Sequence, residues 1–194
     1  MILAYKLDEN FKDTVLLNVK SDCKTVKEVT FGDWTFFVNS ENEINSINLR
    51  NASNYIKIAD NQFWCLSDAD IAAVKKAIED SDLGIVLKLY PKFMYGKIVS
   101  RVNHLKSQKL FIVEINYNAD SNVKLVTNTT DSLEGRVLVF AHLGASTASG
   151  LVVRDGEMMG VASPGMLVGY KTLGIDKEGL IFGHEDQIGQ EFKF

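Results

Sequence analysis

The stretch Phe93–Arg101, which reads FMYGKIVSR, has the alternation of side chains that is typical of a β-strand. Alternate residues of a strand share a face. One face would form the better core, from Met94, Gly96, Ile98 and Ser100. The other would carry an aromatic and basic row of Phe93, Tyr95, Lys97, Val99 and Arg101. Such a row suits RNA, because rings stack on unpaired bases and cations neutralise phosphates. Taken without the rest of the sequence, the row better fits rings that cover a hydrophobic neighbour, such as the first domain, beside solvated lysines.

The chain after Pro91 continues as short runs rich in β-branched residues, separated by glycine, asparagine, aspartate or serine. The further runs are Leu110–Tyr117, Val123–Thr127, Val137–Ala141 and Gly150–Val153. Twelve of the 14 glycines follow residue 90. Many short strands with frequent glycine turns, and no long helical period, predict an all-β barrel or sandwich of about 100 residues.

The first part of the chain has a different pattern. Ser67 stands three residues before Asp70, and apolar residues follow at helical spacing, so we expect a capped helix over 67–80. Short β-type runs precede it, at Thr14–Lys20, Lys24–Thr30, Trp34–Val38 and Tyr55–Ile58. Pro91 favours an extended connection, because it restricts the residue before it. We therefore predict a small α+β domain over 1–88 and an all-β domain over 91–194.

Charge is distributed unevenly along the chain. The 21 basic and 25 acidic residues give a net charge of -4, which by itself argues against a nucleic-acid partner. Residues 88–113, however, hold six lysines and arginines and no acidic residue. This local excess of positive charge favours an anionic partner for that segment.

Signatures of catalysis and metal binding are lacking in the sequence. His104, His142 and His184 are far apart and have no histidine or cysteine partner at ligand spacing. Ser163 stands in a glycine-rich stretch, but nothing nearby supplies the base that a serine nucleophile needs. We therefore expect a protein that is not an enzyme and that uses no cofactor and no metal.

Cysteine use and hydropathy favour a reducing compartment. Cys23 and Cys65 form no CxxC pair, the N-terminal residues lack a basic stretch before an apolar run, and no apolar run approaches the length of a membrane span. We expect a cytoplasmic protein with no membrane association.

A glycine-rich stretch near the C-terminus carries a resemblance to a known family. Gly160–Met166 reads GVASPGM, and Thr172-Leu173-Gly174 and Gly179-Leu180-Ile181 follow it. This pattern resembles the GVxSxGM signature of tRNA-binding OB-folds, found in the bacterial phenylalanyl-tRNA synthetase β chain and in stand-alone YtpR-type proteins. Further matches are His104…Lys109-Leu110, Gly144…Ser149-Gly150, Asn51–Tyr55 and Tyr90–Phe93. The segments 104–110 and 126–132 depart from the family's HPxADKL and VCGAxN patterns.

The resemblance implies a Greek-key OB-fold over 91–194 that binds structured RNA, most plausibly tRNA. The basic segment, the aromatic row and the glycine-rich stretch together predict the RNA-binding residues Lys92, Phe93, Tyr95, Lys97, Arg101, His104, Lys106, Lys109, Ser163 and Met166. For the last two, an equal alternative is a barrel-closing turn that places Met166 in the core.

A second function stays open at this point. An OB-fold with altered loops can serve as a protein-interaction or chaperone-like module instead of an RNA-binding one. A homodimer, and a protein partner for the N-terminal domain, are also compatible with the sequence.

Overall fold

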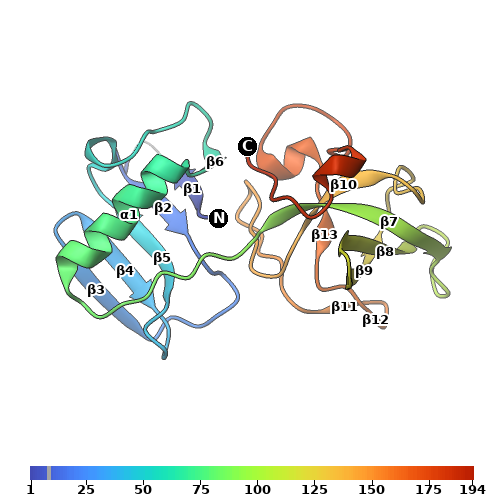
Figure 1. Ribbon diagram of the computed structural model, residues 1–194, viewed down its shortest axis with the longest axis horizontal. Coiled ribbons are helices and arrows are strands. Elements are labelled where there is room, and N and C mark those ends of the chain that lie inside the picture. The colour runs from blue at the N-terminus through green and yellow to red at the C-terminus, as the bar shows by residue number, and fades with distance from the viewer. Residues whose placement is uncertain (8–9) are drawn as a thin grey trace. The chain divides into compact units, whose positions relative to one another are not determined.

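The computed structural model describes residues 1–7 and 10–194 (Figure 1). The chain divides into two compact units, Met1–Tyr90 together with Phe194, and Pro91–Lys193. Among the described residues, no helix is long and apolar enough to cross a membrane.

Unit 1 is a six-stranded antiparallel sheet with a helix, α1, across one face (Figure 1). Its strands are β1 (Leu3–Lys6), β2 (Val15–Asn18), β3 (Lys27–Phe31), β4 (Trp34–Val38), β5 (Ile44–Leu49) and β6 (Phe63–Cys65), with a short 3₁₀ turn, η1 (Ala52–Asn54). The strand order is β3-β4-β5-β2-β1-β6. Phe36, Ile47 and Leu17, from three neighbouring strands, are fully buried and pack into one apolar core with the helix.

α1 (Asp68–Ser81) begins where the sequence predicts a helix. The Ser67 side chain accepts from the Asp70 N–H, and the Asp70 side chain accepts from the Ser67 N–H, which is a capping box. The Asp70 carboxylate also accepts from the Lys57 N–H at 2.8 Å. Ile71 and Val74 face the core.

Unit 2 is built on a curled five-stranded antiparallel sheet in the order β13-β10-β7-β8-β9. Its strands are β7 (Phe93–Asn103), β8 (Phe111–Asn118), β9 (Ser121–Thr127), β10 (Val137–Ala141) and β13 (Met166–Leu167); β11 (Glu157–Met158) and β12 (Val161–Ala162) form a separate hairpin. Within Pro91–Lys193, all of which is described, the only helical turns are η2 (Tyr170–Leu173) and η3 (Glu185–Gln187). Because the edge strands β13 and β9 contact each other, the sheet closes on itself as a partial barrel of OB-like form.

The core of unit 2 lies on the inner face of this curled sheet. Ile98, Val113, Ile115, Leu125 and Phe140 are each fully buried there. As the alternation of Phe93–Arg101 predicts, Met94 and Ile98 face this core. The mainly β character of the chain is therefore confirmed.

A β-bulge in β7 reverses which residues face the core. The β7–β8 register runs Lys97–Asn116, Ile98–Ile115, Ser100–Glu114 and Arg101–Val113. Val99 is thus the extra residue, and the bulge shifts the alternation by one position. Since directly paired residues share a face, Arg101 lies on the inner face with Val113, whereas Lys97 lies on the outer face. The prediction that Lys97 and Arg101 belong to one row is therefore wrong.

Candidate nucleic-acid interface

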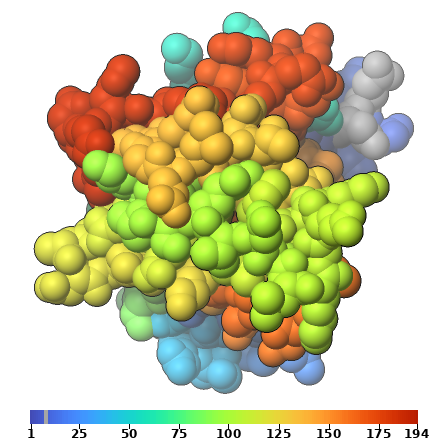
Figure 2. Space-filling model, turned by 90° about the vertical axis from the view of Figure 1, so that its right-hand side faces the viewer, coloured from blue at the N-terminus to red at the C-terminus, as the bar shows by residue number. Residues whose placement is uncertain are grey.

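The β7–β8 loop and the β11–β12 hairpin meet at one end of unit 2. A Cβ atom placed on Gly160 would lie 3.2 Å from the Lys106 Nζ. Gly160 has a φ of 87°, in the left-handed region that favours glycine. Figure 2 shows the yellow-green loop and the orange hairpin side by side on one face. The basic segment and the glycine-rich stretch therefore converge at this end of the unit.

Exposed apolar side chains flank this meeting point. Leu105, next to Lys106, is 99% exposed. Met158 and Met159, just before Gly160, are 43% and 50% exposed. Lys106 and Lys109 are also exposed. This end of the unit thus combines positive charge with flexible apolar side chains, a pairing that suits phosphates beside bases.

His104 holds the β7–β8 loop in place. Its backbone N–H donates to the Leu110 carbonyl at 2.9 Å, and its Nδ1 accepts from the Lys106 N–H at 3.1 Å. With Nδ1 accepting, the Nε2 atom carries the proton in the neutral ring. That Nε2 is buried, and it has no hydrogen-bond partner among the residues that the structure describes.

Arg101 lies flat over an aromatic ring on the inner face. Its Cζ atom is 3.5 Å from the centroid of the Phe111 ring, which is a cation–π contact. The Arg101 Nε is a second buried nitrogen for which the structure contains no hydrogen-bond partner. Phe111 could not be predicted as a partner of Arg101 from the sequence, because the bulge that turns Arg101 towards it leaves no mark in the alternation.

The turn at Ser163 ties the hairpin segment to the edge of the barrel. The Ser163 Oγ accepts from the Val126 N–H of β9 at 3.0 Å. A Cβ on Gly165 would lie only 2.6 Å from the Ala141 carbonyl oxygen, so this position has room for glycine alone. Met166 begins β13, pairs with Ala141 and is half-buried. These contacts give the stretch a role in closing the barrel.

Several predicted contacts are not at the surface. Lys92 is 2% exposed, and its Nζ donates to the Gly144 carbonyl at 2.8 Å. Phe93 is fully buried. His104 is 4% exposed and acts within its loop. The expectation that these three side chains form an open RNA-binding surface is wrong, because each is enclosed by parts of the chain that lie far away in sequence or by its own loop.

The outer face of β7 is covered by the segment Gly183–Phe192. The Tyr95 and Phe192 rings meet edge-to-face, with their centroids 5.6 Å apart. Burial raises the pKa of the Tyr95 hydroxyl. Lys97 forms an ion pair with Glu185 at 2.7 Å. These two predicted residues therefore contact protein on the side where the sequence predicts an RNA-binding row.

Besides His104, three of the ten predicted residues lie in or next to the β7–β8 loop, which meets the β11–β12 hairpin. Lys106 and Lys109 belong to the loop itself, and Arg101 lies on the strand that leads into it. Within the described residues, no cluster of three or more histidine, cysteine, aspartate or glutamate side chains could hold a metal ion.

The curled sheet and the loop–hairpin contact define an OB-like domain with a candidate polynucleotide surface, and comparison with known proteins agrees with this class. The chain is 29% identical over 202 aligned residues to the Bacillus subtilis (strain 168) protein named "Putative tRNA-binding protein YtpR", covering 98% of this chain and 99% of that protein. The resemblance to YtpR-type proteins is thus confirmed over nearly the whole chain. No protein-family model matches the chain.

Part of the chain is also similar to a subunit of a larger enzyme. It is 29% identical over 97 residues to the phenylalanine–tRNA ligase beta subunit of Lactococcus lactis subsp. lactis (strain IL1403), and 31% over 111 residues to that of Xylella fastidiosa (strain 9a5c). These matches cover 50% and 57% of this chain but only 12% and 14% of the subunits. The similarity therefore concerns one region of those subunits.

Proposed function

We propose that the protein binds structured RNA, tRNA above all, without catalysing a reaction. The observation that carries the proposal is the meeting of Lys106 with Gly160, because it joins the basic segment to the glycine-rich stretch at one surface. The named relatives support it, since one is called a tRNA-binding protein and others are subunits of a tRNA ligase.

In this proposal, Pro91–Lys193 is a Greek-key OB barrel. The strand order β13-β10-β7-β8-β9, with β9 against β13, is the arrangement that a five-stranded barrel of this kind requires. OB-folds bind oligonucleotides through the face of their second and third strands and through the loops beside it. Here these are β8, β9, the β7–β8 loop and the segment that contains the β11–β12 hairpin.

Each group in this surface has a distinct proposed role. Lys106 and Lys109 neutralise backbone phosphates, which supplies affinity with little sequence preference. Arg101 and Phe111 offer a stacking surface for a base. Ser163 acts indirectly, because it holds the hairpin segment against β9.

Unit 1 is proposed to be a separate α+β domain that takes no direct part in this contact. Residues 1–90 carry 10 basic and 14 acidic residues, a net charge of 10 - 14 = -4, which does not favour an RNA backbone.

Titration of the full chain with tRNA at several salt concentrations tests the proposal. If three to five phosphates are neutralised, the logarithm of the binding constant should fall with the logarithm of salt at a slope of about -2 to -4. Binding should need neither metal nor nucleotide. A flat salt response, or no binding at low salt, would contradict the proposed phosphate contacts. No binding at any salt concentration would favour a protein-interaction role for the exposed Leu105, Met158 and Met159.

A further inference from the structure

A pocket lies away from the β7–β8 loop, where β7 changes its pairing partner. From Lys97 onward β7 pairs with β8, but at Tyr95 it bonds to the C-terminal segment: the Tyr95 N–H donates to the Gln190 carbonyl at 3.0 Å, and the Gly189 N–H donates to the Tyr95 carbonyl at 2.9 Å. The gap between the end of β8 and this segment forms a pocket of about 620 Å³.

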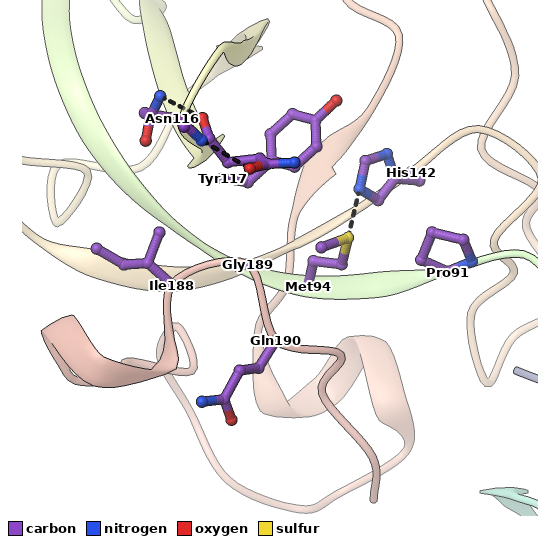
Figure 3. Close-up of a pocket in the computed structure, with 10 residues that line it drawn as sticks. Pro91, Met94, Asn116, Tyr117, His142, Ile188, Gly189 and Gln190 are labelled. Atoms are coloured by element: carbon purple, nitrogen blue, oxygen red, sulfur yellow. Dashed lines mark hydrogen bonds between the residues drawn. The ribbon is translucent and has the colours of Figure 1, made fainter.

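One side of the pocket is formed by soft, polarisable side chains. Figure 3 shows Met94, Tyr117 and His142 close together, across from Ile188 and Gly189. The Met94 Sδ is 3.1 Å from the His142 Nε2, and the Tyr117 and His142 rings meet edge-to-face at 5.1 Å. Aromatic rings and thioethers pack well against flat, polarisable ligands.

The pocket is electrically neutral at physiological pH. None of the ten residues that line it is an aspartate, glutamate, lysine or arginine. Burial lowers the pKa of His142 below its ordinary value of 6.5, so its ring stays uncharged near pH 7. A phosphate or carboxylate would find no cation here, and an ammonium group would find no anion.

Polar groups are nevertheless present beside the rings. Asn116, Asn118 and Gln190 line the pocket. The Gln190 Nε2 donates to the Asp186 carbonyl at 2.8 Å, so the polar groups beside the rings are the carboxamides of Asn116 and Asn118. The Asn116 Nδ2 donates to the Asn118 carbonyl and to the Asn122 Oδ1, which fixes the orientation of that amide. A ligand matched to these walls is flat and uncharged, with donors and acceptors along its edge.

We infer that this pocket binds a nucleobase, either from a free nucleoside or as an unpaired base of an RNA chain. A base has the uncharged ring faces for Met94, Tyr117 and His142 and a polar edge for the carboxamides. Concave sites lined by apolar and aromatic side chains with a few polar groups are typical of small-ligand pockets. The inference concerns residues separate from Lys106, Lys109 and the hairpin, and it does not depend on the proposed binding of tRNA.

Methionine methyl groups can report separately on the pocket and on the β11–β12 hairpin segment. Met94 lies in the pocket, whereas Met158, Met159 and Met166 lie in or beside the hairpin segment. We would label the methionine methyl groups of the full chain with ¹³C and titrate with adenosine, with a short oligoadenylate and with inorganic phosphate. Adenosine should move the Met94 signal in a saturable way and leave the hairpin methionines in place, and phosphate should not move Met94.

The two possible sources of the base give different results in the same titrations. If oligoadenylate saturates the Met94 shift at a concentration at least tenfold lower than adenosine does, the base comes from RNA. If only adenosine moves Met94, the ligand is the free nucleoside. Both results support the inference, whereas an unmoved Met94 signal with both probes, or an equal shift with phosphate, would overturn it.

Variants at the pocket and at the loop provide the matched controls. Ile188→Trp should fill the pocket and weaken the adenosine response of Met94 at least tenfold. Ala119→Trp at the exposed rim should do the same if the first variant fails to fold. Leu133→Trp adds the same side chain at an exposed position of the β9–β10 loop, away from both sites, and should leave the response intact. A response that persists in both pocket variants would overturn the inference, and tRNA titration of the hairpin signals tests the proposed function independently.

Discussion

Lys97 and Arg101 lie four residues apart on one strand and face opposite sides of the sheet, because Val99 is an extra residue between them. Lys97 pairs with Glu185 on the covered outer face. Arg101 lies over Phe111 on the inner face. Two cations that the alternation of the sequence places together therefore have different surroundings, and they should have different effects on RNA binding.

Replacing Arg101 should weaken tRNA binding far more than replacing Lys97. Arg101→Ala removes a stacking surface and a buried donor, and we expect about tenfold weaker binding, or about 1.4 kcal/mol. Lys97→Ala removes a charge that Glu185 already neutralises, so binding should change less than twofold. Fluorescence anisotropy at fixed salt measures both.

Arg101→Lys gives a further comparison at the same position. Lysine keeps the charge but lacks the flat guanidinium, so it should restore only part of the lost affinity. Equal losses for Lys97→Ala and Arg101→Ala would contradict the assignment of Arg101 to the binding surface.

The salt dependence of binding should identify the phosphate contacts. Changing Lys106 and Lys109 together to alanine should reduce the slope of binding against salt by about two units, because each lysine accounts for about one phosphate. The control is the double change of Lys75 and Lys76, two exposed lysines of α1, which removes the same charge from unit 1. If the control flattens the slope equally, overall charge and not the loop governs binding.

Ser163 should prove to be a structural residue of the barrel. Ser163→Ala leaves the buried Val126 N–H without its acceptor, which costs about 1–3 kcal/mol. Hydrogen exchange at the Val126 amide should be faster in the variant, because this edge of the barrel opens more readily. Ser107→Ala removes a hydrogen bond that lies in solvent and should change stability by less than about 0.5 kcal/mol. Unchanged exchange at Val126 would contradict the proposed role.

His142 should make the protein less stable in mild acid. Burial lowers the pKa of its ring below the ordinary value of 6.5, so folding favours the neutral form. The resulting stability is present above the ordinary pKa and is lost as the pH falls through the lower pKa of the folded state. The melting temperature should therefore fall between pH 7 and pH 5, and His142→Gln should reduce that fall.

His184→Gln is the matched control for this prediction, since His184 is exposed. It should leave the pH dependence of the melting temperature nearly unchanged. An NMR titration of the His142 ring gives the pKa directly, and a value at or above 6.5 would contradict the argument.

Local patterns in the sequence predicted much of the fold. The helix α1 was predictable because Ser67, Asp70 and the apolar spacing act within one or two turns of chain. The run Val137–Ala141 is a strand with the predicted bounds, and its five residues are all buried. The run Tyr55–Ile58 is not a strand, because η1 and the capping contact from Lys57 to Asp70 bend the chain there.

The binding residues were predicted less well than the fold, because the exposure of each side chain depends on contacts between residues that are distant in sequence. Lys92 is buried, and its Nζ donates to the carbonyl of Gly144, which lies 52 residues away in the sequence. The bulge at Val99 depends on how β7 pairs with β8, and neither strand alone reveals it. Lys106 and the glycine-rich stretch could be proposed separately from the sequence, but only the fold brings them to one place.

The C-terminal segment that covers β7 also bears on self-association. At Phe93 and Tyr95 the backbone is bonded to β10 on one side and to Gly189–Phe192 on the other. An uncovered strand at this position would offer a row of free amides and carbonyls, beside a buried phenylalanine, to any other chain. Because Gly189–Phe192 already bonds to these groups, this edge of β7 is closed to edge-to-edge pairing with a second copy of the barrel.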